Sequence, residues 1–558
     1  MSKKNYAMKM KLLFILLLLL SIVDNKVTKA QGINIIKGAE INSEMKMVKV
    51  IEEINGKLFT VLKYSKKYYL RSYHKNLEVA NFSELTMRYN GKKLEYKDVV
   101  EIKSRLFYLC IYNNKKEKKK FLLYQEINPN TLAAINELTV LGEIPYKKRR
   151  HDGGFKITYS HNKNKVLVYY SMPYEKEGQQ KITINVLDSN LNKLWQKNIT
   201  LPYTDKLFTI HDLEVDNEGN VYIIGRKWTG EHGNSKRAKI TFSFVVLGYK
   251  NEGKEEREYK LVFKDKYITQ ARLAIDNDLN LICAGFYSNS DRYHGYVGYH
   301  SQSNPFYGTS HKDGYFGIGG AFFLKINHID GNVMISNSKE FSYSFLYKGS
   351  NEQAEKKEEK QNNEEEKPSK TNRLPRYHLN EIVIRSDGGI LLIAEHTYVI
   401  EYVKTDADGM KHKSHEYNAN NIIVLNFNPD GNVKWMHMVT KRQSSYSYKY
   451  ISYVNAVYKD NLLFIYNDNI KNANSCKDLD NKGHAKFHSN TTPKRSNLVS
   501  YQINSNNEFE YSILFNAKTE KFMVIPTLSK QLKYSNDVIL VSIWDKKLRL
   551  YRIEFEDK

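Results

Sequence analysis

The chain has 558 residues, and its 86 Lys and Arg against 62 Asp and Glu give a formal charge of +24. This length exceeds the roughly 250–300 residues that one hydrophobic core supports, so we expect several domains or a repeat architecture. Cys110, Cys283 and Cys476 are too few and too scattered for a disulfide framework or a zinc site. Cys110 and Cys283 lie in apolar runs and are expected in the core.

Residues 1–30 are predicted to be a signal peptide. Lysines precede the apolar run Leu12–Val23, and the small residues Thr28 and Ala30 follow it. A retained membrane anchor is the alternative, but the run is shorter than the ~20 residues that cross a bilayer. We therefore expect cleavage near Ala30 and a secreted or periplasmic chain with no further transmembrane segment.

The charge of the mature chain permits an acidic partner without requiring one. Residues 1–30 contain six Lys and one Asp, so their removal leaves a net charge of +19. Weak binding to a polyanion is possible on these grounds. Abundant Lys, Asn, Ile and Tyr with few Pro is also typical of an AT-rich genome, and the basic clusters Lys115–Lys120 and Lys147–Arg150 lie between predicted strands. We expect no specific nucleic-acid partner.

Two kinds of hairpin alternate along the mature chain. The first kind has alternating apolar residues, a polar turn and a short apolar run, a pattern typical of strands. Its copies are Glu53–Tyr64, Glu101–Tyr112, Phe155–Ser171, Asp212–Gly225, Leu273–Gly285, Glu381–Glu395 and Asn455–Asp468. The second kind places a bulky or aromatic residue after the turn, in Ile184–Ile199, Phe323–Ser336, Ile422–Val439 and Val499–Phe515. Together the two hairpins make a four-stranded antiparallel unit.

The spacing of the turns predicts the architecture. Turns of the first kind fall near residues 55, 104, 163, 219, 278, 388 and 460, with a last candidate near 518. A four-stranded unit repeated at such a period indicates an all-β protein, a β-propeller of seven or eight four-stranded antiparallel blades over residues 31–558. A string of β-sandwiches is the runner-up, but it would need longer strands and larger units.

The stretch from Asp216 to Gly219 could be read as part of a calcium loop or as a hairpin turn. We predict the turn, because equivalent turns lose the acidic residues and one short hairpin cannot supply the 6–8 oxygen ligands that calcium takes. The same argument makes Thr405–Gly409 a turn.

The clearest hairpins of the second kind are Asn192–Trp195 and Asp430–Trp435. Their alternation with the first kind, behind a signal peptide, resembles a broad group of exported bacterial β-propeller proteins, mostly uncharacterised. The resemblance is architectural and covers nearly the whole mature chain. It implies a ligand-binding scaffold, a glycan-active enzyme or an envelope assembly protein, and it transfers no catalytic residue.

Two insertions interrupt the repeats. Residues 288–318 are rich in Tyr, Gly, Ser and His, which together give adaptable contact surfaces. The candidates for sugar stacking or protein contact are Tyr293, His294, Tyr296, Tyr299, His300, Phe306, Tyr307, His311 and Tyr315; a surface loop without a ligand is the alternative. We expect no metal there, because no fixed element sets the spacing of the histidines. Residues 348–374 carry seven basic and seven acidic residues and no aromatic one, and are predicted to be disordered.

The sequence contains none of the common catalytic motifs, so the catalytic residues stay unknown and no cofactor is expected. Glu395–His396 at a strand end and Glu231–His232 in a loop could each serve as acid–base groups. Isolated Glu-His neighbours are common, however, and adjacent residues on a strand point to opposite faces, so a structural placement is favoured. Ser445–Tyr453 alternates Tyr with polar residues like an edge strand.

The leading hypothesis is an exported, non-catalytic propeller that binds a protein or glycan partner in the cell envelope or outside the cell. The alternative is a glycan hydrolase or lyase whose carboxylates converge at the channel mouth.

Overall fold

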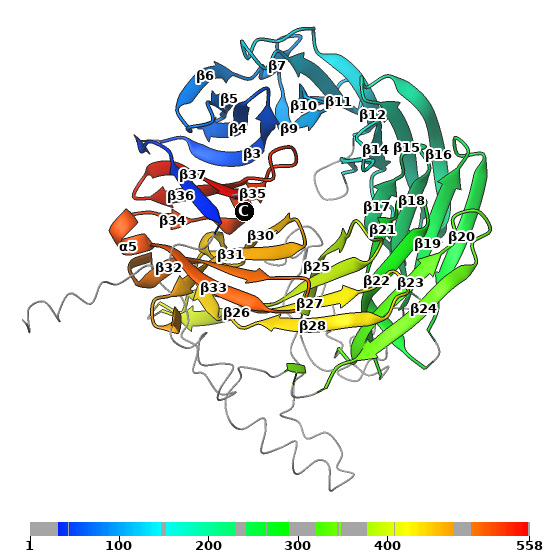
Figure 1. Ribbon diagram of the computed structural model, residues 1–558. Helices are drawn as coiled ribbons and strands as arrows, with labels where there is room; N and C mark the ends of the chain where they lie inside the picture. The colour runs from blue at the N-terminus through cyan, green and yellow to red at the C-terminus, as the bar shows by residue number, and fades with distance from the viewer. Residues whose placement is uncertain are drawn as a thin grey trace, which may run out of the picture.

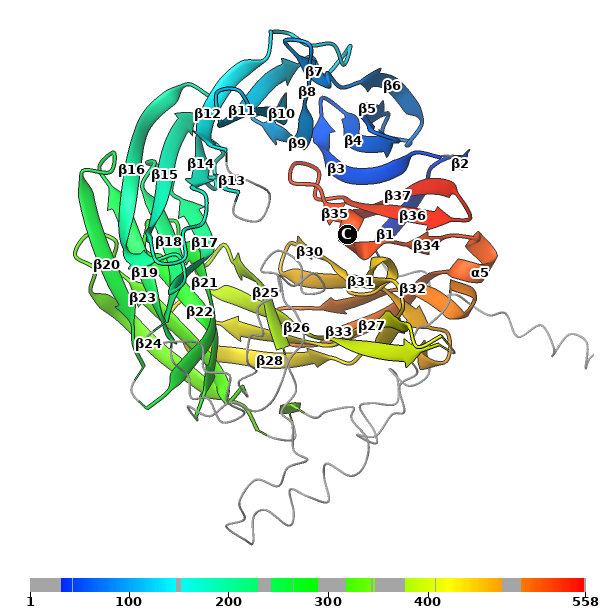
Figure 2. The ribbon, with the colours of Figure 1, turned by 180° about the vertical axis from the view of Figure 1, so that it is seen from behind.

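The computed structural model describes residues 32–42, 44–146, 152–228, 242–263, 265–289, 318–342, 345–346, 377–406, 408–473 and 493–555. Within these residues, eight antiparallel sheets stand around a common axis (Figures 1 and 2). The prediction of a β-propeller is confirmed, and the number of blades is eight.

Blades 1 to 4 follow one another along the chain. Blade 1 is β3 (Lys46–Ile54), β4 (Lys57–Tyr64), β5 (Lys67–Tyr73) and β6 (Val79–Glu84), followed by the small hairpin β7 (Arg88–Tyr89) and β8 (Lys92–Lys93). Blade 2 is β9 (Glu95–Ile102), β10 (Arg105–Asn114), β11 (Lys119–Ile127) and β12 (Thr139–Pro145). Blade 3 is β13 (Gly154–Tyr159), β14 (Lys165–Ser171), β15 (Gln179–Asp188) and β16 (Lys193–Thr204). Blade 4 is β17 (Phe208–Val215), β18 (Val221–Trp228), β19 (Phe242–Lys250) and β20 (Glu255–Leu261).

Blades 5 to 8 complete the ring. Blade 5 is β21 (Tyr267–Ile275), β22 (Leu281–Ser288), β23 (Gly320–Ile326) and β24 (Val333–Glu340). Blade 6 is β25 (Tyr377–Ile384), β26 (Ile390–Thr405), β27 (Lys411–Phe427) and β28 (Val433–Val439), with β29 (Gln443–Ser445) on β27 and η1 (Tyr448–Tyr450) after it. Blade 7 is β30 (Val454–Tyr458), β31 (Asn461–Asn469), β32 (Ser496–Ile503) and β33 (Phe509–Asn516), with η2 (Pro493–Arg495) and α5 (Ala517–Glu520) beside it. Blade 8 is β34 (Met523–Val524), η3 (Pro526–Leu528), β35 (Lys530–Gln531), β36 (Val538–Trp544), β37 (Lys547–Phe555), β1 (Ile33–Lys37) and β2 (Ile41–Asn42).

The core is divided among the blade-to-blade contacts. One apolar cluster lies between each pair of neighbouring blades, including blades 8 and 1. Because both faces of every sheet are covered, second strands such as β22 are buried along their whole length. This explains why the runs after the first-kind turns are continuously apolar. Cys110 and Cys283 are fully buried free thiols, as predicted.

The two ends of the described chain close the ring. Strand β1 pairs antiparallel with β37, with Ile33 opposite Phe555 and Ile35 opposite Ile553. Blade 8 therefore combines its outermost strand from the start of the chain with inner strands from the end. Arg552 of β37 is fully buried and donates to Glu53 of blade 1 at 2.5 Å and to Asp537 at 2.8 Å. Closure thus rests on strand pairing, on apolar packing and on a buried cation.

Antiparallel order gives the ring two different faces. The turns between first and second strands and between third and fourth strands share one face, here called the turn face. The connections between second and third strands and between consecutive blades share the other, here called the insertion face. Residues 288–318 join β22 to β23, and residues 348–374 lie between β24 and β25, so both insertions attach to the insertion face.

Seven of the eight predicted inner turns are confirmed, and the candidate near residue 518 is wrong. Asn516 there accepts bonds from the backbone N–H groups of Lys518 and Thr519, which makes it the N-cap of α5 instead of part of a hairpin turn. The eighth inner turn is residues 532–537, between β35 and β36. The prediction of an edge strand at Ser445–Tyr453 is also wrong beyond Ser445, because this segment turns through η1 to connect blade 6 to blade 7.

Among the described residues, no helix is long and apolar enough to cross a membrane.

We predict that deletion of residues 31–37 lowers the Tm of the mature chain by at least about 5 °C, because the edge of β37 and the cluster between blades 7 and 8 lose their cover. Calorimetry would measure the shift. A synthetic peptide of residues 31–37 should restore part of it by adding the strand in trans. An unchanged Tm would contradict closure through β1.

Candidate functional site

The first strand of each blade lies nearest the axis (Figure 1). Polar side chains of these strands form a belt there. Lys49 of blade 1 pairs with Asp98 of blade 2 at 2.7 Å. Arg272 of blade 5 pairs with Asp212 of blade 4 at 3.1 Å, and Lys156 of blade 3 lies 3.8 Å from the same carboxylate. Positive and negative side chains therefore alternate over the first five blades.

The belt continues in blades 5 to 8 through hydrogen bonds in which at least one partner is an amide or a backbone group. Arg272 also donates to the backbone oxygen of Asn380 at 3.0 Å. Asn455 of blade 7 donates its amide to Glu381 of blade 6. Gln531 of blade 8 donates to the backbone oxygen of Val457 at 2.8 Å. Most of these bonds join one blade to the next, so the belt stabilises the ring from inside.

Glu214 follows Asp212 by two residues on β17 and is half-buried. Burial, reinforced by the Asp212 carboxylate, raises the pKa of Glu214 to about 8. Burial also raises the pKa of Glu381, against the opposing effect of the Asn455 amide. Glu214 therefore holds a proton at neutral pH close to the ion-paired Asp212, an arrangement that can donate a proton to a bound group.

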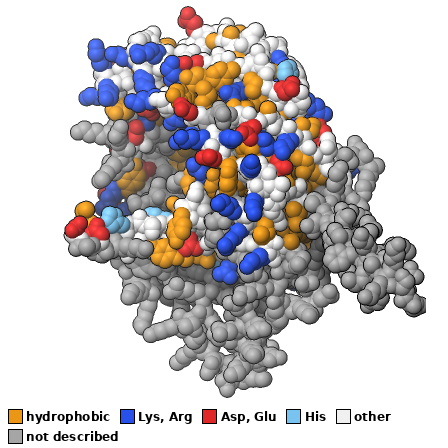
Figure 3. All heavy atoms as spheres, turned by 90° about the vertical axis from the view of Figure 1, so that its left-hand side faces the viewer, with side chains coloured by type: hydrophobic (Ala, Val, Ile, Leu, Met, Phe, Trp, Pro, Cys, Tyr) orange, Lys and Arg blue, Asp and Glu red, His pale blue; other side chains and the backbone are white. Residues whose placement is uncertain are grey.

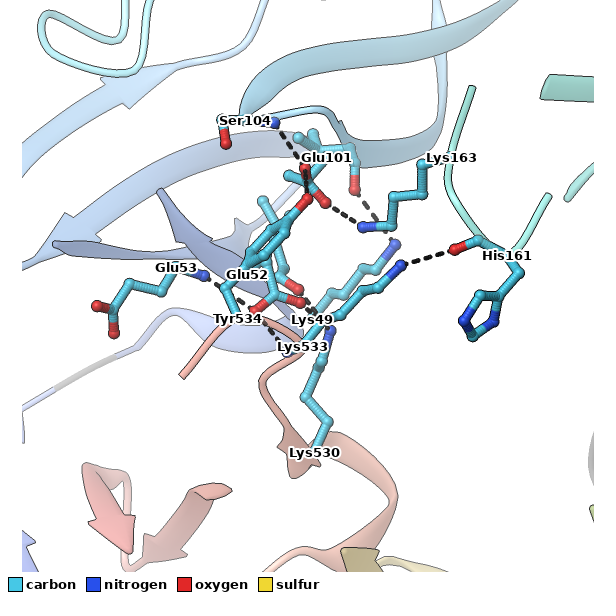
Figure 4. A network of polar contacts seen from close by, with 12 residues as sticks. Lys49, Glu52, Glu53, Glu101, Ser104, His161, Lys163, Lys530, Lys533 and Tyr534 are labelled. Atoms are coloured by element: carbon cyan, nitrogen blue, oxygen red, sulfur yellow. Dashed lines mark hydrogen bonds and ion pairs between the residues drawn. The ribbon is translucent and has the colours of Figure 1, made fainter. Parts of the chain in front are cut away.

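A second network lies at the turn face, where residues 532–537 reach across the first three blades (Figure 4). The backbone N–H of Lys533 donates to Glu52 of blade 1 at 3.0 Å. The hydroxyl of Tyr534 donates to Glu101 of blade 2 at 2.8 Å, and Lys533 donates its ammonium group to the backbone oxygen of His161 in blade 3 at 3.0 Å. This turn thus connects blade 8 to three other blades.

The two carboxylates under this turn are buried and well bonded. Glu52 accepts from Lys530 at 3.2 Å, and Glu101 accepts from the backbone N–H of Ser104 at 2.8 Å and pairs with Lys163. Burial alone would raise the pKa of Glu101, but the bonds from Lys163, Ser104 and Tyr534 outweigh it and lower the pKa below its ordinary value. Glu101 is therefore a fixed anion that orients the Tyr534 ring.

The predicted turns carry their acidic residues for structural reasons. Asp216 accepts the backbone N–H groups of Glu218, Gly219 and Asn220 at 2.8–2.9 Å with one oxygen, and the Asn220 amide at 2.7 Å with the other. Gly219 has φ of +97°, which favours glycine. Asp406 likewise accepts the N–H of Met410 at 2.8 Å. Both stretches are turns, as predicted.

The predicted ligand-binding residues do not belong to the part of the chain that the structure describes. Tyr293, His294, Tyr296, Tyr299, His300, Phe306, Tyr307, His311 and Tyr315 all lie outside the described residues, as do Glu231, His232 and Cys476. Glu395 is fully buried and pairs with Lys441 at 2.6 Å, while the ring of its neighbour His396 lies beside Tyr377 and Tyr398. Glu395 therefore stabilises the packing of blade 6 and does not form an acid–base pair with His396.

The axial belt was missed from the sequence, although a signal for it exists. Six inner strands carry a charged residue six or seven positions before the turn positions given above: Lys49, Asp98, Lys156, Asp212, Arg272 and Glu381. Aligning the hairpins by their turns would have placed these residues at one level. No comparable sequence pattern indicates that residues 532–537 contact blades 1 to 3.

The side of the ring around α5 shows Lys and Arg interspersed with acidic and apolar side chains (Figure 3). A protein that tracks a nucleic-acid backbone presents a continuous basic stripe. No such continuous stripe is seen on this side of the ring.

Comparison with known proteins shows a likeness of fold alone. No protein-family model matches the chain, and no curated protein matches its sequence. The WD40 domain of SCAP from fission yeast is similar at 8% identity, covering 95% of this chain and 97% of that chain, with a TM-score of 0.39. The β-propeller domain of the Trilobed protease from Pyrococcus furiosus is 8% identical, with 86% of this chain and 98% of that chain covered and a TM-score of 0.33. A protein of unknown function from Bacteroides caccae is 9% identical, with 71% of this chain and 93% of that chain covered and a TM-score of 0.26. The strand order of the chain itself defines it as a β-propeller, and its similarity to these proteins carries no information about its ligand.

The raised pKa of Glu214 predicts a pH-dependent stability. Because the folded-state pKa of about 8 exceeds the ordinary value of 4.5, the stabilising contribution is present below pH 4.5 and is lost as the pH rises to 8. The loss is about 1.4 kcal/mol per pH unit across that window at most. Denaturant unfolding should therefore show Glu214→Gln more stable than the wild type at pH 9 and nearly equal at pH 5. Glu137→Gln, at an exposed site, is the control, and equal behaviour of both variants would contradict the assignment.

Proposed function

We propose that this protein is an exported β-propeller that binds a protein or glycan partner through its insertion face. The observation that carries the proposal is the one-sided placement of the insertions. Residues 288–318 and 348–374 both attach to this face, whereas the described connections on the opposite face are short turns, apart from residues 128–138 between β11 and β12. In a scaffold of repeats, long connections on one face are where ligand contacts are made. Export rests on the predicted signal peptide, residues 1–30.

A projecting hairpin beside the aromatic insertion supports the same face. Strands β26 and β27 have 16 and 17 residues, whereas the second and third strands of the other blades have 7–10. The extension lies on blade 6, next to blade 5, which carries residues 288–318. It exposes Tyr402 (40%) and Met410 (62%), and Tyr446 near its base is 74% exposed. Exposed aromatic and apolar side chains at one place are typical of recognition surfaces.

A glycan hydrolase or lyase is the second candidate, and Glu214 favours it. A protonated carboxylic acid near an ionised one is the arrangement that donates a proton to a glycosidic oxygen. Against it, Asp212 is already bound by Arg272 and Lys156, which reduces its ability to act as a nucleophile or base. We therefore rank binding first.

The binding proposal is tested with the mature chain from Gln31 and a variant in which Ser290–Gly314 is replaced by a short Gly-Ser loop. A glycan array and a pull-down from envelope extract should both be run. We expect the mature chain to bind a glycan or an envelope protein in one of these assays, and the variant to lose that binding. A variant with residues 352–366 replaced in the same way is the control, since this insertion has no aromatic residue and should be dispensable. Equal binding by all three proteins would contradict a role of residues 288–318.

The enzymatic candidate predicts a different result. Wild-type protein would cleave one of the polysaccharides, and Glu214→Gln would reduce the rate by about 10²-fold or more, as expected for loss of a general acid. The release of reducing ends and of unsaturated products distinguishes hydrolysis from elimination. Activity that persists unchanged in Glu214→Gln would exclude this residue as the proton donor.

A further inference from the structure

The turn-face network has more cations than anions. Lys49, Lys163 and Lys530 each pair with one carboxylate, those of Asp98, Glu101 and Glu52. Lys103 and Lys533 belong to the same neighbourhood, and among the described residues neither forms an ion pair with a carboxylate. Lys533 donates to a backbone oxygen, which carries no full charge. Two positive charges are therefore uncompensated at this end of the channel.

These cations lie close to one another. Figure 4 shows Lys163 of blade 3 directed at Glu101 and Lys533 of blade 8 directed at the backbone oxygen of His161, with their ammonium groups in the same region. Burial and then the charges of Lys163 and Lys103 lower the pKa of Lys533, against the opposing effect of Glu101 and Glu52. An anion placed among the ammonium groups would relieve this repulsion.

An exposed aromatic ring stands beside them. Tyr534 is 50% exposed although it lies within the network. Its hydroxyl bond to Glu101 fixes the ring, and the ammonium group of Lys163 lies 5.4 Å from the ring centroid. A ring held in this way loses little entropy when a flat apolar surface stacks on it. The turn thus presents a rigid aromatic surface next to excess positive charge.

We propose that residues 532–537 and the neighbouring Lys103 form a binding site for an acidic sugar, a pyranose ring that carries a carboxylate or a sulfate. The sugar ring stacks on Tyr534, and the acidic group lies between Lys533 and Lys103. A neutral sugar would leave the two lysines without a counter-charge. Single-stranded nucleic acid also combines rings with anions, but it is bound by grooves with several aromatic side chains along a strand. A single ring beside two cations that have no carboxylate partner among the described residues fits a short acidic saccharide better. This site lies on the turn face and does not depend on the insertion-face proposal.

The test is calorimetric titration of the mature chain, from Gln31, with tetragalacturonate and with a heparin-derived tetrasaccharide, which separate carboxylate from sulfate recognition. Maltotetraose is the neutral control, and dT8 is the nucleic-acid control. We expect at least one acidic tetrasaccharide to bind, with an affinity that falls as NaCl is raised from 50 to 300 mM, and neither control to bind comparably.

Four variants locate the site. Tyr534→Ala should weaken binding about tenfold, whereas Tyr534→Phe keeps the stacking ring but loses the bond that fixes it, and should weaken binding clearly less than Tyr534→Ala does. Lys533→Gln and Lys103→Gln should each weaken binding about two- to fivefold. Lys546→Gln removes an exposed lysine of the same blade, at the turn between its second and third strands on the opposite face, and should change nothing.

Three results would overturn the proposal: no binding of either acidic tetrasaccharide at millimolar concentration, unchanged affinity in both Tyr534→Ala and Lys103→Gln, or tighter binding of dT8. Lys103 forms no bond within the network, so its variant separates loss of the site from disturbance of the turn. The variant with Ser290–Gly314 replaced should keep this affinity, so failure here and failure of the insertion-face proposal can be told apart.

Discussion

Each blade of this protein is apolar on both faces, and that constraint governs the rest of the structure. A four-stranded sheet with two apolar faces cannot be stable alone in water, because each face must be covered by another sheet. Eight such sheets cover one another only if the last packs on the first, as the cluster between blades 8 and 1 shows. Pairing of β1 with β37, together with the buried Arg552, completes this contact.

Closure also decides where polar chemistry can occur. The sheet faces are filled by apolar side chains, so charged groups lie along the axis, at the two ends of the ring and on the outer strands. Along the axis they are mostly paired between blades, as with Lys49 and Asp98 or Arg272 and Asp212. Glu214 on the axis instead keeps its proton, and at the turn face Lys103 and Lys533 have no carboxylate partner among the described residues. The two faces differ as well. The insertion face bears the long insertions, and the turn face bears mostly short turns, with residues 532–537 of blade 8 in contact with blades 1 to 3.

Much of the fold could be predicted because hairpins are local. Alternating apolar residues and turns such as Asp216–Gly219 specify a hairpin within about fifteen residues of chain. The eighth inner turn was predicted at the wrong place for two reasons. Blade 8 takes its outermost strand, β1, from the other end of the chain, so its hairpins do not follow the repeat. Asn516 is also a residue type common in turns, but here it is the N-cap of α5. The contacts of Tyr534 with Glu101 join residues far apart in sequence, and no periodicity reports such a contact. The candidate ligand residues from Tyr293 to Tyr315 stay a prediction from composition.

The central claim is that a partner binds the insertion face. Hydrogen–deuterium exchange on the mature chain, with and without a partner recovered from envelope extract or a glycan array, tests it most directly. We predict slower exchange in residues 286–320 and in the extension of β26 and β27, residues 397–419, with the strand ends at the turn face unchanged. Protection confined to the turn face or to the inner strands would contradict the claim and would move the principal binding site to the channel.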